Sequence, residues 1–138
     1  MNLNFQLQAI GVFQIVLALM HLTFARRFNW RTETARLSLL NRQIFYVHTF
    51  FICVVLTLFG LLNLACTPEL LTRSALAKFV LAGITVFWVL RWLIQFFVYD
   101  RRLWKGNRFN TTMHVVFASL WTYFAGVYGL ALWHQFAT

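Results

Sequence analysis

Three of the four histidines in the sequence, His21, His48 and His114, each lie a short distance inside a long apolar run. At the helical rise of 1.5 Å per residue, each lies roughly 7–9 Å from the basic residue that bounds its run. Successive membrane-crossing helices alternate in direction, so these distances all run inward from the same membrane face. The spacing therefore predicts one layer of imidazoles at a shared depth.

A further apolar run adds other polar side chains to this layer. Gln95 precedes Asp100 and lies roughly 7–8 Å inside the run, with Arg91 about one turn deeper. Arg91 and Gln95 share a helical face at i, i+4, and Tyr99 continues that face toward the surface. Ionisable side chains are costly in a membrane and tend to face an interior, so the layer predicts a functional site.

The chemistry open to the histidines is metal or haem ligation. Neutral imidazoles from separate helices can converge on one metal ion or supply the axial ligands of a haem. We therefore expect His21, His48 and His114 to bind a metal ion or haem b, in a redox or metal-assisted role. The alternative is structural, because membrane histidines also form interhelical hydrogen bonds that contribute about 0.6 kcal/mol on average.

The remaining polar residues of the layer have supporting roles in this interpretation. Arg91 would neutralise an anionic group, such as a haem propionate, a quinone oxygen or a lipid head group. Gln95 and Tyr99 would orient that group. Gln14 lies on the same stripe as His21, and we expect it to support that histidine.

Other polar and aromatic residues favour simpler roles. Asn63 is interpreted as a helix-end polar group and His134 as an interfacial residue. Several Trp and Tyr residues are interpreted as interfacial or packing aromatics. Among these are Trp30, Trp104, Tyr123 and Tyr128.

No catalytic residue can be identified from the sequence. The only acidic residues are Glu33, Glu69 and Asp100, and all three lie in connections between apolar runs. This placement argues against a proton-coupled transporter and against a carboxylate-rich di-iron site. Two further function classes stay open. One is a non-catalytic membrane subunit or assembly factor of a larger complex, and the other is a protein that binds or modifies lipid head groups.

Four apolar runs must position these residues. Each has about the 20 residues that a helix needs to cross the hydrocarbon core, and unpaired backbone groups are not tolerated there. The sequence predicts an all-α membrane protein, an antiparallel bundle of four transmembrane helices that forms one domain over residues 1–138. The predicted helices cover residues 3–26, 42–65, 75–100 and 110–134. Thr67 and Pro68 additionally favour the start of a short helix.

The charge pattern gives the expected orientation. The chain carries a net charge of +9, yet nine of its twelve basic residues fall in two connections, Arg26 to Arg42 and Arg101 to Arg108. Basic residues are retained on the cytoplasmic side, so both termini are expected on the opposite side. We expect a multi-pass protein of the cell (inner) membrane. No soluble domain remains to present a basic surface, so nucleic acid is not an expected partner.

Small residues predict the contact faces of the helices, because helices in lipid associate through close packing. Gly11 and Ala18 mark such a stripe in the first run, Gly60 marks one in the second, and Ala125 and Gly129 mark one in the last. The expected partners are the lipid bilayer and either a larger membrane complex or further copies of the chain.

Overall fold

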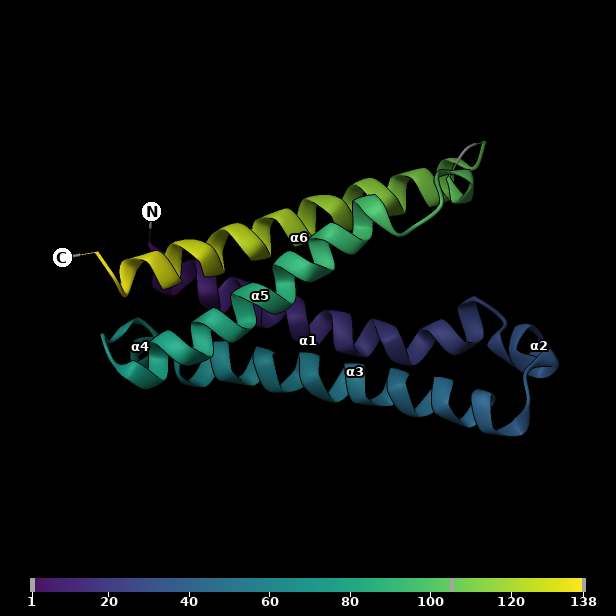
Figure 1. Cartoon of the computed structure of the whole chain (residues 1–138), viewed down its shortest axis with the longest axis horizontal. Coiled ribbons are helices and arrows are strands. Elements are labelled where there is room, and N and C mark those ends of the chain that lie inside the picture. The colour runs from purple at the N-terminus through teal and green to yellow at the C-terminus, as the bar shows by residue number, and fades with distance from the viewer. Residues whose placement is uncertain (1, 105, 138) are drawn as a thin grey trace. The chain divides into compact units, whose positions relative to one another are not determined.

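The computed structural model describes residues 2–104 and 106–137, which form helices and contain no strand. Four long helices coincide with the apolar runs, and each is long and apolar enough to cross a membrane. They are α1 (Leu3–Arg27), α3 (Leu39–Ala65), α5 (Ala75–Phe97) and α6 (Arg108–His134) (Figure 1). The all-helical fold and the four candidate spans are therefore confirmed, and the chain has the helices of a multi-pass membrane protein.

Short elements occupy the connections between the long helices. They are α2 (Trp30–Glu33), η1 (Thr34–Arg36), α4 (Thr67–Leu71) and η2 (Arg101–Leu103). The predicted short helix is confirmed as α4, which begins at Thr67. The hydroxyl group of Thr67 donates a hydrogen bond to the backbone oxygen of Asn63, one turn back in α3.

The start of α3 and the end of α5 each lie three residues from the predicted bounds. Helix α3 begins at Leu39 rather than at residue 42, because Ser38 Oγ accepts a hydrogen bond from the backbone nitrogen of Asn41 at 3.4 Å. Such a cap satisfies one of the unpaired donors at a helix start. Helix α5 ends at Phe97 rather than at residue 100. Asp100 instead caps η2, accepting from the backbone nitrogen of Arg102 at 2.8 Å.

The chain divides into two compact units. One consists of Phe5–Thr67 and holds most of α1 together with α2, η1 and α3. The other consists of Pro68–Thr138 with Met1–Asn4 and holds most of α4 together with α5, η2 and α6. The arrangement of all four long helices as one antiparallel bundle in one domain, and the membrane orientation, stay predictions from the sequence.

In the Phe5–Thr67 unit, two glycines bring α1 and α3 into backbone contact. A Cβ atom added to Gly11 would lie 2.9 Å from the backbone oxygen of Gly60, and one added to Gly60 would lie 2.9 Å from that of Gly11. Only a residue without a side chain permits this approach, which is the usual reason for small residues in membrane helix contacts. The small-residue stripes correctly predicted these two positions.

In the other unit, α5 and α6 pack through large aromatic rings. Trp88 is 1% exposed. Its ring stacks on Trp121 with a centroid distance of 5.1 Å and meets Phe124 edge-on at 4.7 Å. A Cβ atom added to Gly129 would meet nothing within 4 Å. The stripe predicted in the last run therefore gives no close contact at Gly129, because bulky side chains determine how α6 packs on α5.

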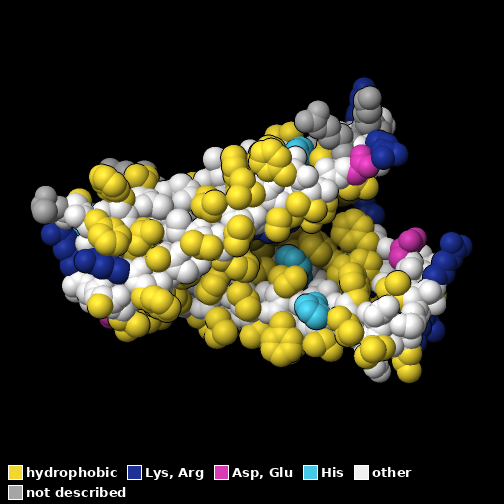
Figure 2. Space-filling model, in the orientation of Figure 1, with side chains coloured by type: hydrophobic (Ala, Val, Ile, Leu, Met, Phe, Trp, Pro, Cys, Tyr) yellow, Lys and Arg dark blue, Asp and Glu magenta, His cyan; other side chains and the backbone are white. Residues whose placement is uncertain are grey.

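The surface has the composition expected of a protein in lipid. Hydrophobic side chains cover the lengths of the helices, and Lys and Arg side chains gather at their ends (Figure 2). Large exposed side chains on the four helices include Leu19, Phe50, Phe79 and Leu130. A soluble protein seldom exposes so much contiguous apolar surface, so this distribution fits membrane-spanning helices.

Candidate functional site

Gln95 on α5 is the centre of a polar cluster between α5 and α6. Its side chain is 5% exposed. The Oε1 atom accepts hydrogen bonds from Trp121 Nε1 at 3.3 Å and from Arg91 Nη1 at 3.4 Å. The Nε2 atom lies 2.8 Å from Nδ1 of His114. One buried amide thus joins three polar side chains from two membrane-spanning helices.

Arg91 lies against the aromatic side chains of this cluster. Its guanidinium carbon is 4.9 Å from the centroid of the Trp121 ring and 5.7 Å from that of Tyr99. A cation over an aromatic face at such distances is attracted by the ring's quadrupole. Arg91 and Gln95 share one face of α5 at i, i+4. Tyr99 lies beyond the end of α5 at Phe97, and its ring still reaches Arg91.

His114 is held from two sides. Its ring stacks on Trp104, with centroids 4.0 Å apart and ring planes 25° apart, and Phe96 approaches it edge-on at 6.0 Å. Trp104 comes from the connection between α5 and α6. The bond to Gln95 and the stack on Trp104 together fix the orientation of the imidazole.

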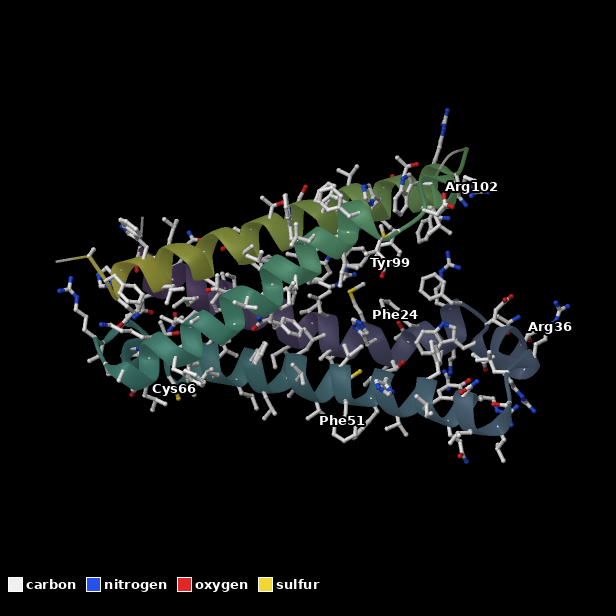
Figure 3. The ribbon with its side chains drawn as sticks, viewed as in Figure 1. Phe24, Arg36, Phe51, Cys66, Tyr99 and Arg102 are labelled. Carbon is white, nitrogen blue, oxygen red and sulfur yellow. The ribbon has the colours of Figure 1, made fainter. Side chains whose placement is uncertain are left out.

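Arg91 has no carboxylate partner among the described residues. The ion pair nearest to it along the chain joins Asp100 to Arg102, with 3.0 Å between Oδ2 and Nη2. Arg102 Nε also donates to both carboxylate oxygens, at 3.3 Å and 3.1 Å. Figure 3 shows Tyr99 and Arg102 at the same end of α5 and α6. The acid that follows Tyr99 is therefore already neutralised by another arginine.

The other two predicted ligands, His21 and His48, belong to the Phe5–Thr67 unit. Nδ1 of His21 lies 2.7 Å from the backbone oxygen of Leu17, and Nδ1 of His48 lies 2.8 Å from that of Ile44. Each ring therefore bonds within its own helix. His21 is partly buried, and His48 is exposed.

A metal site receives no support from the placement of these side chains. Within residues 2–104 and 106–137, no group of three or more His, Cys, Asp or Glu side chains is placed to hold a metal ion. His114 is engaged by Gln95 and Trp104, and His48 is turned to the surface. The metal ligation predicted for His21, His48 and His114 therefore stays a prediction from the sequence alone.

Gln14 has a different partner from the one expected. It is fully buried, and its Oε1 atom accepts a hydrogen bond from Asn63 Nδ2 at 2.9 Å. Asn63 Nδ2 also donates to the backbone oxygen of Phe59 at 2.9 Å. The described bond of Gln14 thus joins α1 to α3 beside Gly11 and Gly60. A role for Gln14 in supporting His21 stays a prediction.

Sequence reasoning missed three members of these polar contacts. Trp121 was not identified, although it lies seven residues from His114 and so on the same helical face. Trp104 was interpreted as an interfacial or packing aromatic, yet it stacks on His114. Asn63 was interpreted as a helix-end group, yet it is buried and bonded to Gln14. Spacing gives a signal for Trp121 only, because the other two contacts depend on tertiary packing.

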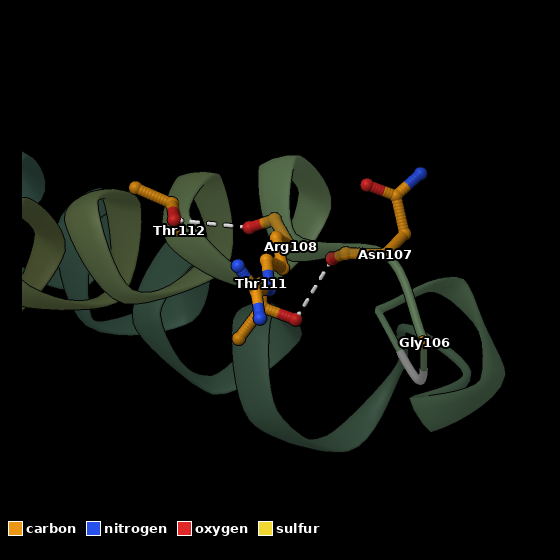
Figure 4. A pocket seen from close by; sticks show the side chains of 5 residues that line it. All are labelled: Gly106, Asn107, Arg108, Thr111 and Thr112. Carbon is orange, nitrogen blue, oxygen red and sulfur yellow. Dashed lines mark hydrogen bonds between the residues drawn. The ribbon is translucent and has the colours of Figure 1, made fainter.

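A surface hollow of about 450 Å³ lies at the start of α6 and contains none of the predicted site residues. Gly106, Asn107, Arg108, Thr111 and Thr112 line it (Figure 4). The hydroxyl groups of Thr111 and Thr112 donate to the backbone oxygens of Asn107 and Arg108, at 3.0 Å and 2.9 Å. The polar side chains of the hollow are therefore largely bonded within the helix start.

The polar cluster of α5 and α6 combines a positive charge, further hydrogen-bond donors and aromatic rings. These groups suit an anionic oxygen ligand, because arginine presents several donors in a planar fork. Comparisons of this chain with protein-family models, with curated proteins and with solved structures found no match. Its function must therefore be inferred from the chemistry of its own residues.

Proposed function

We propose that this multi-pass membrane protein binds the phosphate group of a membrane phospholipid at the cluster of Arg91, Gln95, Tyr99 and His114. The observation that carries the proposal is the Arg91 guanidinium. It belongs to a membrane-spanning helix, and its described neighbours are an amide and two aromatic rings. A charge in that setting is costly without a counter-ion. A phosphate would supply the negative charge and accept two parallel hydrogen bonds from arginine.

The position of Arg91 along α5 favours a lipid head group as the source of this phosphate. Arg91 precedes the end of α5 at Phe97 by about 9 Å at the helical rise. A long arginine side chain at this depth can reach the level of the lipid phosphates. The aromatic rings of Tyr99 and Trp104 are typical of that interfacial level. Arg108 at the start of α6 would further attract anionic lipid.

We prefer lipid binding to a metal or haem site because the side chains that would bind the lipid, Arg91, Gln95, Tyr99 and His114, all lie in one unit. Three histidines suitable for a metal are not gathered within the described residues. A haem held by two histidines stays a prediction from the sequence. An absorption spectrum in the Soret region and elemental analysis of the purified protein test that prediction directly.

Co-purified lipid tests the proposal. The protein would be extracted in a mild detergent, and bound phospholipid would be identified by native mass spectrometry. We expect Arg91→Leu to lose the bound lipid, with Arg91→Gln as a second variant that keeps a polar side chain of similar length. Arg36→Leu, at an exposed position of η1 in the other unit, is the matched control and should keep it.

Two results would overturn the proposal. One is lipid retention by both Arg91 variants at the wild-type level. The other is displacement of the lipid by an equal concentration of inorganic phosphate, which would mean that the site takes free phosphate instead of a lipid head group. Circular dichroism of each variant confirms that a loss of lipid is not a loss of helix.

A further inference from the structure

We infer that the network of Arg91, Gln95, His114 and Trp121 presents only hydrogen-bond donors to the ligand, and that the site therefore selects phospholipids with a net negative head group over zwitterionic ones. The inference rests on the proposed lipid site and names the class of lipid. It follows from the direction of each hydrogen bond around Gln95 and from the charges nearby.

The orientation of the Gln95 amide is set by its two donors. Tryptophan Nε1 and arginine Nη1 can donate a hydrogen bond but cannot accept one. The amide atom that faces both Trp121 Nε1 and Arg91 Nη1 must therefore be the oxygen, as the structure has it. Amide orientations are assigned from such networks. The nitrogen of Gln95 then faces His114, and this nitrogen can only donate.

The tautomer of His114 follows from the orientation of that amide. Because Gln95 Nε2 donates across 2.8 Å, His114 Nδ1 must accept and carries no proton. A neutral imidazole with a bare Nδ1 has its proton on Nε2. A doubly protonated ring would set an N–H group against the N–H of Gln95 and lose the bond. The neutral imidazole of His114 therefore donates through Nε2.

Every hydrogen-bonding group of the network that has no described partner is a donor. The Gln95 oxygen already receives two hydrogen bonds, which fill its two lone pairs. The remaining groups are the other N–H groups of Arg91, the second N–H of Gln95 and the Nε2–H of His114. A phosphate oxygen can accept from all of these. A head-group hydroxyl can likewise accept through its oxygen, whereas an ammonium group has no lone pair to offer and would find no partner among them.

The charges around the cluster disfavour the ammonium group of a zwitterionic head group. Asp100 already pairs with Arg102. Aromatic faces can also bind an ammonium group. However, Arg91 already lies over the Trp121 ring, and the His114 ring already stacks on Trp104. Arg91 itself repels a second cation at close range. An anionic head group, such as phosphatidylglycerol or phosphatidic acid, meets none of these obstacles.

Binding to lipids of defined head group tests the selection. Wild-type protein would be titrated with phosphatidylglycerol and with phosphatidylcholine of the same acyl chains, and the occupancies compared by native mass spectrometry. We expect a preference of about tenfold for the anionic lipid, because Arg91 repels the ammonium group of the zwitterionic one. Gln95→Glu supplies a carboxylate to Arg91 and should abolish the preference. Gln43→Glu, at an exposed position of α3, should keep it.

A second measurement on the wild-type protein does not depend on the folding of a variant. The ¹⁵N chemical shifts of the histidine ring nitrogens distinguish the two neutral tautomers, and His114→Gln assigns the signal. We expect a proton on Nε2 and none on Nδ1. A proton on Nδ1 overturns the inference. Equal binding of the two lipids, still lost in Arg91→Leu, overturns the inference and leaves the proposed lipid site standing. Binding that does not depend on Arg91 overturns both.

Discussion

Gln95 on α5 donates a hydrogen bond to Nδ1 of His114 on α6 across 2.8 Å, and no other described side-chain hydrogen bond engages that imidazole. The same amide accepts from Arg91 and Trp121. Networks of this kind polarise one another in a medium of low dielectric constant, and a half-satisfied network is costly. Gln95 therefore connects the stability of the α5–α6 pair to the electrostatics of the proposed lipid site.

Removing this amide should destabilise the protein. In Gln95→Leu, the Nε1 atom of Trp121 and the Nδ1 atom of His114 lose their described partner. We expect a loss of about 1–3 kcal/mol in the free energy of unfolding, the cost of buried polar groups left unsatisfied. Reversible unfolding of detergent-solubilised protein measures it. Gln43→Leu is the control at an exposed position, and equal stability of the two variants would contradict the prediction.

The glycine contact between α1 and α3 gives a second prediction. Gly11→Ala and Gly60→Ala would each put a Cβ atom 2.9 Å from a backbone oxygen. We expect each to cost about 1–3 kcal/mol in stability, as overpacking generally does. Gly83→Ala and Gly126→Ala are matched controls, because a Cβ atom at either position meets nothing within 4 Å.

Those two control variants should be neutral or slightly stabilising, since alanine favours a helix over glycine by roughly 0.5–1 kcal/mol. Thermal unfolding of the four variants under the same conditions compares them. If all four behaved alike, close packing at Gly11 and Gly60 would not hold α1 and α3 together.

The buried pair of Gln14 and Asn63 should show energetic coupling. Its side chains are bonded at 2.9 Å between two helices. A double-mutant cycle with Gln14→Leu, Asn63→Leu and the double variant should give a coupling of about 0.6 kcal/mol, with about 1.7 kcal/mol as the upper range for such bonds in membranes. Additive effects of the two changes would show that the bond contributes nothing to stability.

The planar shape of Arg91 should matter as well as its charge. Arg91→Lys keeps the positive charge but loses the planar fork and the stacking on Trp121 and Tyr99. We expect it to weaken the binding of phosphatidylglycerol by about tenfold, between the wild type and Arg91→Leu. Arg73→Lys, at an exposed position just before α5, is the control. If Arg91→Lys bound phosphatidylglycerol with wild-type affinity, the prediction would be wrong, and binding would require only the positive charge.

The sequence by itself determined the helices of this protein. Apolar runs of about 20 residues must be helical in lipid, because the backbone has no other way to satisfy its polar groups. It also determined that Arg91 and Gln95 lie together, since their spacing puts them on one face of one helix, whereas Tyr99 lies beyond the end of α5. The ends of α3 and α5 were predicted less well, because the caps at Ser38 and Asp100 depend on single side-chain hydrogen bonds.

The partner of each polar side chain was decided only by the tertiary structure. Spacing along the chain gives the depth of a residue in the membrane, but neither the rotation of its helix nor the identity of the neighbouring helix. That is why Gln14 bonds to Asn63 on α3, and why His114 meets Gln95 and Trp104 while His21 and His48 bond to their own helices. Helix rotation is set by the packing of whole faces, such as Gly11 on Gly60, and is therefore a property of both helices together.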